Sequence, residues 1–144
     1  MRKSSIDKEK ILSKIDELDG YLEELEQIKP ADFDEYKNSI EKKRAVERLL
    51  QIAIETVIDI SNIIVSGLKL GIPYDEDSLL DKLEEKNVIS KEIKNIMKEM
   101  KGFRNVLVHK YAEVKDEIVF ENLNKLDDFD KFKEEILSFL KKHS

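Results

Sequence analysis

The 144-residue sequence has no cysteine and no tryptophan, only two prolines and only two histidines. Without cysteine the chain can form neither disulfides nor thiolate zinc sites, and two histidines are too few for a histidine-rich metal site. Carboxylates are abundant, but no group of them has the spacing of metal ligands. We therefore expect no metal and no cofactor.

The sequence also lacks the features of exported and membrane proteins. Its first ten residues are charged and contain no apolar leader, and no later stretch approaches the roughly 18 apolar residues that a membrane span needs. We expect a cytoplasmic protein with no membrane contact, folded as a single domain over residues 1–144. The formal net charge of −6 argues against a general nucleic-acid coat protein but leaves room for a local basic site.

What the chain does have is helical periodicity. Apolar residues recur at spacings of four and three from Ile11 to Leu25, which predicts a helix from residue 4 or 5 to residue 28, where Lys29-Pro30 stops it. A second, longest helix is expected over residues 34–70. Its second half, 51–65, is apolar on most sides, which places it in the centre of a bundle.

Turn signals divide the rest of the chain. Gly71 and Pro73 lie in a loop, followed by a short helix over residues 79–85 and a longer one from 91 to about 111. The predicted N-caps are Asp77 or Ser78 for the first of these helices and Ser90 for the second.

Helical periodicity resumes at residue 114 and continues to the C-terminus, as one long helix or as two collinear helices with a break at Asp127-Asp128. The sum predicts an all-α fold: an up-and-down antiparallel bundle of four main helices plus a short one.

A polar strip interrupts the central helix. It consists of Glu55, Asp59 and Asn62, spaced by four and three on an otherwise apolar element. The strip either reaches solvent and caps neighbouring backbone, or lines a functional cleft.

A basic ridge follows one face of the helix that begins at residue 91. Its members recur at spacings of three, four and three and lead directly to Arg104; they are Lys91, Lys94, Lys98 and Lys101. Such a run is usually a solvated face, but it also suits a surface that tracks phosphates.

The ridge ends in the segment 104–111, which gathers Arg104, His109 and Tyr111. Arginine holds phosphate bidentately, histidine transfers protons near neutral pH, and tyrosine donates a hydrogen bond. This set suits phosphodiester chemistry. The alternative is an ordinary amphipathic helix whose polar residues form its solvent-exposed face.

On an ideal helix Arg104 and His109 are about 140° apart around the axis, which is awkward for joint contact with one phosphate. Either the arginine side chain reaches around, the helix loosens near Val108, or a second subunit brings its own copy of the motif. We favour the last, a two-fold homodimer with the motif in its cleft.

The pattern Arg-Asn-x-x-x-His-x-Tyr, preceded by Gly102-Phe103, resembles the signature of the HEPN superfamily, specifically the HepT-like toxins of prokaryotic toxin–antitoxin pairs. Residues 44–64 are similar to that family's long second helix, and the loop 71–74 also fits. The resemblance covers nearly the whole chain.

The resemblance implies a dimeric helical bundle that acts as a metal-independent endoribonuclease. It also implies a partner, a minimal nucleotidyltransferase antitoxin, which in some pairs transfers AMP from ATP onto the motif tyrosine, here Tyr111. In this interpretation the RNA 2′-hydroxyl attacks the adjacent phosphate, His109 transfers protons, and Arg104 stabilises the developing charge. Asn105 would orient His109 from one turn below, and Lys110 joins the basic ridge in contacting RNA.

Two other functions stay open. One is a non-catalytic module that binds a nucleotide or a protein and partners a nucleotidyltransferase, which suits the acidic net charge. The other is a purely structural bundle, in which the motif side chains would point in unrelated directions.

Overall fold

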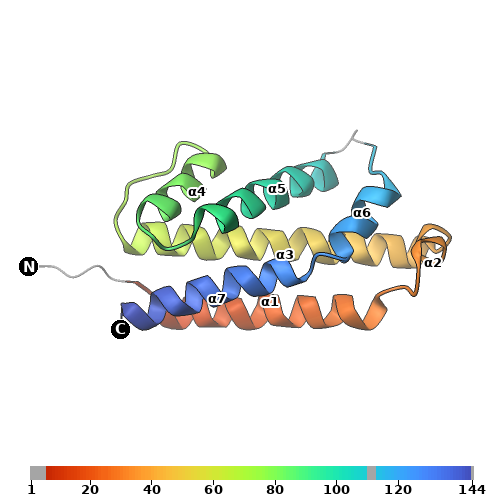
Figure 1. The fold of residues 1–144 in the computed structure, drawn as a ribbon, viewed down its shortest axis with the longest axis horizontal. Helices are drawn as coiled ribbons and strands as arrows, with labels where there is room; N and C mark the ends of the chain where they lie inside the picture. The colour runs from red at the N-terminus through yellow and green to blue at the C-terminus, as the bar shows by residue number, and fades with distance from the viewer. Residues whose placement is uncertain (1–5, 110–112, 144) are drawn as a thin grey trace, which may run out of the picture.

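A computed structural model describes residues 6–109 and 113–143, and within them the chain forms seven α-helices and no strand (Figure 1). The prediction of an all-α fold is confirmed. Four helices are long, as expected: α1 (Lys8–Ile28), α3 (Ile40–Gly67), α5 (Lys91–Val108) and α7 (Asp127–Lys142). Three are short, where one was expected: α2 (Phe33–Lys37), α4 (Glu76–Glu85) and α6 (Asp116–Leu123).

Helix α1 follows its sequence pattern closely. Asp7 caps it by accepting a hydrogen bond from the Lys10 amide at 3.1 Å. The helix ends at Ile28, before Pro30. Its predicted apolar stripe is buried and packs against α3; the stripe consists of Ile11, Ile15, Leu18, Leu22 and Leu25.

The expected single helix over residues 34–70 is wrong at its start. The chain forms the short α2, turns at Asn38, and begins α3 at Ile40. Ser39 has an extended backbone, and its hydroxyl accepts a hydrogen bond from the Lys42 amide at 3.2 Å. A serine in this position offers the backbone a cap instead of a continued helix, which explains the break.

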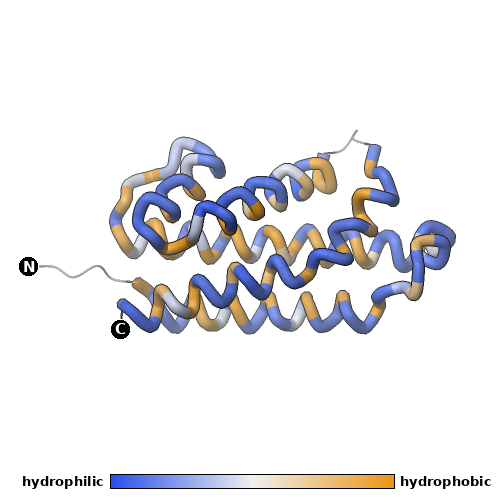
Figure 2. The backbone as a smooth tube through the Cα atoms, in the orientation of Figure 1, coloured by the Kyte–Doolittle hydropathy of each residue, from blue (hydrophilic) through white to orange (hydrophobic). Residues whose placement is uncertain are grey.

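Helix α3 is the centre of the bundle, in contact with α1, α2, α4, α5 and α6. By length and composition it is apolar enough to cross a membrane, the one such helix in the described part of the chain. The expectation that no stretch approaches this size is therefore wrong. More than half of its apolar window, 56%, is buried inside the bundle, and Figure 2 shows hydrophobic residues recurring along its length. Packing on several sides accounts for this composition.

The C-terminal periodicity resolves into two helices. Figure 1 shows α6 running across the end of the bundle and α7 running along α1, so the two helices are not collinear. An aromatic cluster fastens α6 to α2, with the Phe120 ring 5.5 Å from Phe33 and 5.9 Å from Tyr36. An ion pair between Lys133 and Asp19 joins α7 to α1.

Candidate active site at the end of the motif helix

Helix α5 leads to the motif; it is capped at its start and buried along one face. Ser90 caps it, as predicted, by accepting a hydrogen bond from the Ile93 amide at 3.1 Å. Ile93, Met97, Met100 and Phe103 are its buried residues. The motif therefore sits at the far end of a firmly packed helix.

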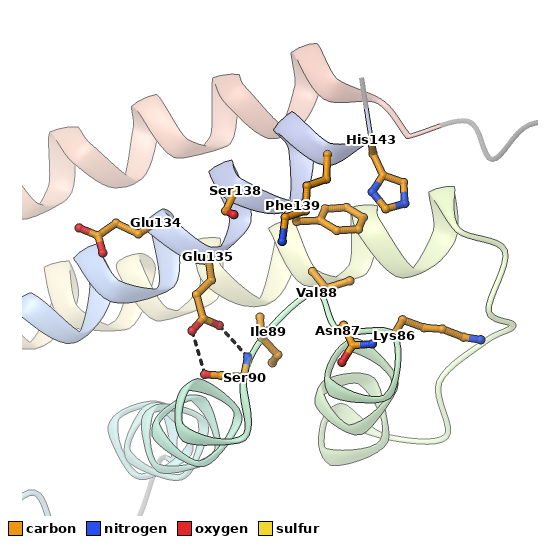
Figure 3. A pocket seen from close by; sticks show the side chains of 11 residues that line it. Lys86, Asn87, Val88, Ile89, Ser90, Glu134, Glu135, Ser138, Phe139 and His143 are labelled. Carbon is orange, nitrogen blue, oxygen red and sulfur yellow. Dashed lines mark hydrogen bonds between the residues drawn. The ribbon is translucent and has the colours of Figure 1, made fainter.

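The N-terminus of α5 borders a groove of about 510 Å³ between the α4–α5 turn and α7. Figure 3 looks into this groove and shows Glu135 reaching from α7 to Ser90. Phe139 and His143 line it as well, with their ring centroids 4.2 Å apart. His143, the second histidine of the chain, thus lies at the opposite end of α5 from His109.

The motif helix is shorter than predicted. It ends at Val108, and His109 has φ −73° and ψ 118°, an extended backbone. The His109 amide still donates to the Asn105 carbonyl at 3.1 Å, and the His109 side chain is exposed. Because His109 has left the helix, the 140° separation from Arg104 calculated for an ideal helix does not apply. Lys110 and Tyr111 lie outside the described residues.

Arg104 is held from three sides and is only 12% exposed at its side chain. Its Nε donates to the Asn105 Oδ1 at 3.0 Å, and its Nη2 donates to Glu76 at 2.5 Å. Its Nη1 lies 4.0 Å from the Glu55 carboxylate. Asn105, expected to orient His109, thus contacts Arg104 through its side chain and His109 through its backbone carbonyl.

The polar strip of α3 does not stay together at this site. Glu55 reaches Arg104 and accepts a hydrogen bond from Gln51 at 3.2 Å. Asp59 instead lies 3.7 Å from Lys14 of α1. The Asn62 side chain donates to the Ile58 carbonyl at 3.3 Å, one turn back along its own helix. Of the three residues, Glu55 is the one that the fold brings to the motif.

Basic side chains along α5 meet carboxylates from α4, and we call this set the α4–α5 ladder. Its first three rungs are Lys94 with Glu84 (2.8 Å), Lys98 with Asp81 (3.1 Å) and Lys101 with Asp77 (2.8 Å). Arg104 with Glu76 is the fourth rung. The hydrogen bond from Lys101 lowers the pKa of Asp77, and the hydrogen bond to Glu84 raises the pKa of Lys94. Lys91, the first lysine of the predicted ridge, is exposed at the start of the helix.

The acidic residues of the α4–α5 ladder were not identified by the sequence analysis. They are Glu76, Asp77, Asp81 and Glu84. Asp77, Asp81 and Glu84 are spaced by four and three, which puts them on one face of a short helix, and Glu76 precedes them at its start. That face complements the basic face of α5. This complementarity between two charged faces could have predicted from the sequence that the two helices pair.

A second groove lies on the side of α5 away from the ladder. It has a volume of about 470 Å³ and runs between α5 and α6, past Gly102, Val106 and Ile118. Val106 and Ile118 are 41% and 46% exposed, and the nearby Val108 is 47% exposed. An apolar surface therefore lies directly beside the motif.

The described residues hold no group of three or more histidine, aspartate or glutamate side chains that could bind a metal ion. What the site offers is one enclosed guanidinium, one exposed imidazole and two carboxylates.

The chain is similar in sequence to a known protein family. Residues 18–136 match the family described as Ribonuclease HepT-like. The chain is 30% identical over 110 residues to the tRNA nuclease HepT of Aphanizomenon flos-aquae, covering 76% of this chain and 75% of that one. It is 30% identical over 123 residues to the mRNA nuclease HepT of Shewanella oneidensis, covering 85% and 92%.

Solved structures agree with the sequence matches. A tri-AMPylated HEPN toxin of Shewanella oneidensis in complex with an MNT antitoxin has a TM-score of 0.82 and 29% identity, covering 89% of this chain and 96% of that one. The cytosolic protein YutE of Bacillus subtilis has a TM-score of 0.84 at 19% identity, covering 98% and 95%, which shows a shared fold. The resemblance indicated by the motif is confirmed, and the chain belongs to the HepT-like ribonuclease family.

Proposed function

We propose that this protein is the endoribonuclease toxin of a type II toxin–antitoxin pair. The observation that carries the proposal is the end of α5, where an exposed His109 follows Arg104 at the point where the helix opens into extended chain. Membership in the HepT-like family and the relatives named as tRNA and mRNA nucleases support it. The proposed location is the cytoplasm, where RNA targets are found.

The proposed reaction needs no metal. The RNA 2′-oxygen bonds to the adjacent phosphorus while the bond from phosphorus to the 5′-oxygen breaks, and His109 takes the proton from the 2′-hydroxyl and returns a proton to the leaving 5′-oxygen. Arg104 stabilises the charge that develops on the phosphoryl oxygens. Tyr111 contacts the phosphate or base. Asn105 positions Arg104 through its side-chain oxygen and the His109 backbone through its carbonyl.

RNA contacts along α5 are part of the proposal. Lys91 is exposed and can meet a phosphate directly, and Lys110 is assigned the same role. Lys94, Lys98 and Lys101 each have an α4 carboxylate within 3.1 Å, so they would contact RNA only by exchanging that partner. Glu55 belongs to the site through Arg104, and roles for Asp59 and Asn62 remain predictions.

A homodimer is the proposed working form. The groove between α5 and α6 leaves Val106 and Ile118 nearly half exposed beside the motif. A second copy of the chain covering this surface would bury them and bring two motifs to one cleft.

The proposed partner is a minimal nucleotidyltransferase antitoxin, as in the solved complex of the Shewanella oneidensis HEPN toxin. Transfer of AMP to Tyr111 would add bulk and negative charge where an RNA phosphate must sit, and so shut the site by repulsion. Mass spectrometry of the toxin incubated with antitoxin and ATP tests this, and the absence of an adduct on Tyr111 would favour simple occlusion.

Expression of the chain alone tests the ribonuclease proposal. Wild type should arrest growth, and the purified protein should cut RNA in the presence of EDTA. His109→Ala should lower cleavage by about 10²- to 10⁴-fold, the usual contribution of a general acid or base. His143→Ala is the matched control, because this histidine stacks on Phe139 at the other end of α5 and should cut like wild type.

The competing function is a binding module that partners a nucleotidyltransferase without cutting RNA. The net charge of −6 and the neutralised ladder favour it. Equal toxicity of wild type and His109→Ala, or no toxicity in either, would favour the binding module over the ribonuclease.

A further inference from the structure

The guanidinium of Arg104 presents two edges on which it can grip a phosphate bidentately, Nε with Nη2 and Nη1 with Nη2. Glu76 lies on Nη2, which both edges share, at 2.5 Å. Asn105 takes the Nε and Glu55 flanks the Nη1. The Nε edge is therefore occupied by protein partners, and the Nη1 edge shares its second nitrogen, Nη2, with Glu76 and lies beside the Glu55 carboxylate.

The net charge around Arg104 also opposes the binding of a phosphate. One guanidinium faces two carboxylates within 4.0 Å, so the cluster carries a net charge of −1. An approaching phosphodiester, itself an anion, is repelled by this cluster. Release of Glu76 would remove both one negative charge and the competitor for Nη2, and so favour contact between Arg104 and a phosphate.

Glu76 can leave without moving its helix. Its side chain is 37% exposed, so it can rotate into solvent. Leu79, Leu80 and Leu83 are at most 1% exposed and keep α4 docked, and the neighbouring Asp77 stays bound to Lys101. The exchange is confined to one side chain.

We propose that Glu76 is a positioning residue that acts as a displaceable counter-ion: it holds Arg104 in the empty site and is replaced by a phosphate of the RNA. This inference rests on the proposed ribonuclease function. Glu76 thereby weakens the binding of RNA, because the phosphate must displace it. The chemical step uses Arg104 after Glu76 has left.

Binding of a single-stranded 2′-O-methyl RNA, which has no 2′-hydroxyl and is not cut by this chemistry, tests the inference by fluorescence anisotropy. Glu76→Gln keeps the shape of the side chain and removes its charge, so it should lower the Kd about tenfold. Because the phosphate contacts Arg104 in both proteins, the slope of log Kd against log salt should change by less than the roughly 0.7 expected for one additional phosphate contact.

The matched control is Glu85→Gln, which removes the same charge from an exposed position of the same helix that is not part of the ladder. The Kd of this variant should stay within about twofold of wild type. Glu76→Asp keeps the charge but shortens the side chain and should give an intermediate Kd; it also decides the matter if the glutamine variant folds poorly.

Equal Kd values for Glu76→Gln and Glu85→Gln, or weaker binding in Glu76→Gln, would overturn the inference. In cleavage assays Glu76→Gln should lower KM with kcat within about threefold of wild type. A fall in kcat at constant KM would instead make Glu76 a support for the chemical step. If wild type cuts no RNA, the ribonuclease proposal fails, whereas the binding comparison still tests the counter-ion.

Discussion

Glu135 of α7 accepts hydrogen bonds from both donors of Ser90, the cap of α5, although the two residues are 45 positions apart. Its carboxylate accepts a hydrogen bond from the Ser90 amide at 2.7 Å and another from the Ser90 hydroxyl at 2.8 Å. The hydroxyl in turn accepts from the Ile93 amide. The start of the motif helix is thus fixed by a helix from the other end of the chain.

Loss of the hydrogen bonds between Glu135 and this cap should destabilise the protein. We expect Glu135→Ala to lower the free energy of unfolding by about 1 to 2 kcal/mol, because the amide and hydroxyl of Ser90 lose their acceptor. Urea unfolding followed by circular dichroism measures this. Glu134→Ala removes an exposed neighbour with the same charge and should change the value by less than about 0.5 kcal/mol. Equal losses in both variants would contradict the capping role.

Removal of the Tyr36 hydroxyl should stabilise the protein. Tyr36 is fully buried, burial raises its pKa, and its hydroxyl is the one buried side-chain polar atom without a hydrogen-bond partner in the described parts of the chain. Tyr36→Phe deletes this unsatisfied group and keeps the packing against Phe120, so we expect a gain of about 1 kcal/mol in thermal or urea unfolding. A loss of stability would show that the hydroxyl has a partner, such as a bound water.

Asp128 should make stability depend on pH. Burial, followed by the charge of Asp127, raises its pKa in the folded protein. The folded state therefore holds this proton more tightly than the unfolded state, so the charged carboxylate destabilises the fold above its folded pKa. Asp128→Asn should stabilise the protein at neutral pH by up to about 1 kcal/mol.

The advantage of Asp128→Asn should shrink as the pH falls through the folded pKa of Asp128 and vanish once wild type is protonated in both states. Unfolding curves at neutral and acid pH measure it. A constant difference across this range would rule out titration of Asp128 as the cause.

The proposed dimer surface can be tested with a charge. Val106→Glu places a carboxylate in the groove between α5 and α6, and burial of that unpaired charge should convert the dimer to a monomer in sedimentation or light scattering. RNA cleavage should fall with it, because each site would lose its partner copy. Leu137→Glu is the control, since Leu137 of α7 is similarly exposed at 44%. A Val106→Glu monomer with full activity would refute the dimer requirement.

Local patterns predicted the long elements well. The five apolar residues at helical spacing in α1 are its buried residues, and Ser90 caps α5 as expected. Both features depend on neighbours within one or two turns, which a sequence displays directly. The break at Ser39 depends on a balance between capping and helix continuation, which the apolar pattern on either side concealed.

The end of α5 and the ladder depend on distant parts of the chain. No glycine or proline stands between residues 103 and 115, so no standard stop signal marks the end of the helix at Val108. The partners of the α5 lysines come from α4, whose position follows from burial of its leucines against α3 and α5. Sequence analysis identified Arg104 and His109 as candidates, but not Glu76, because contact between helices is not a local property.

The ladder has a consequence for how the protein meets a large polyanion. Its four cations and four carboxylates cancel, so this face adds no long-range attraction to a chain whose formal charge is −6. Diffusional encounter with any nucleic acid then begins against a weak repulsion, which salt screens over a Debye length of about 8 to 10 Å. Moderate salt should therefore speed the first collision while weakening the close contacts that follow, and capture would be governed by short-range fit rather than by electrostatic steering.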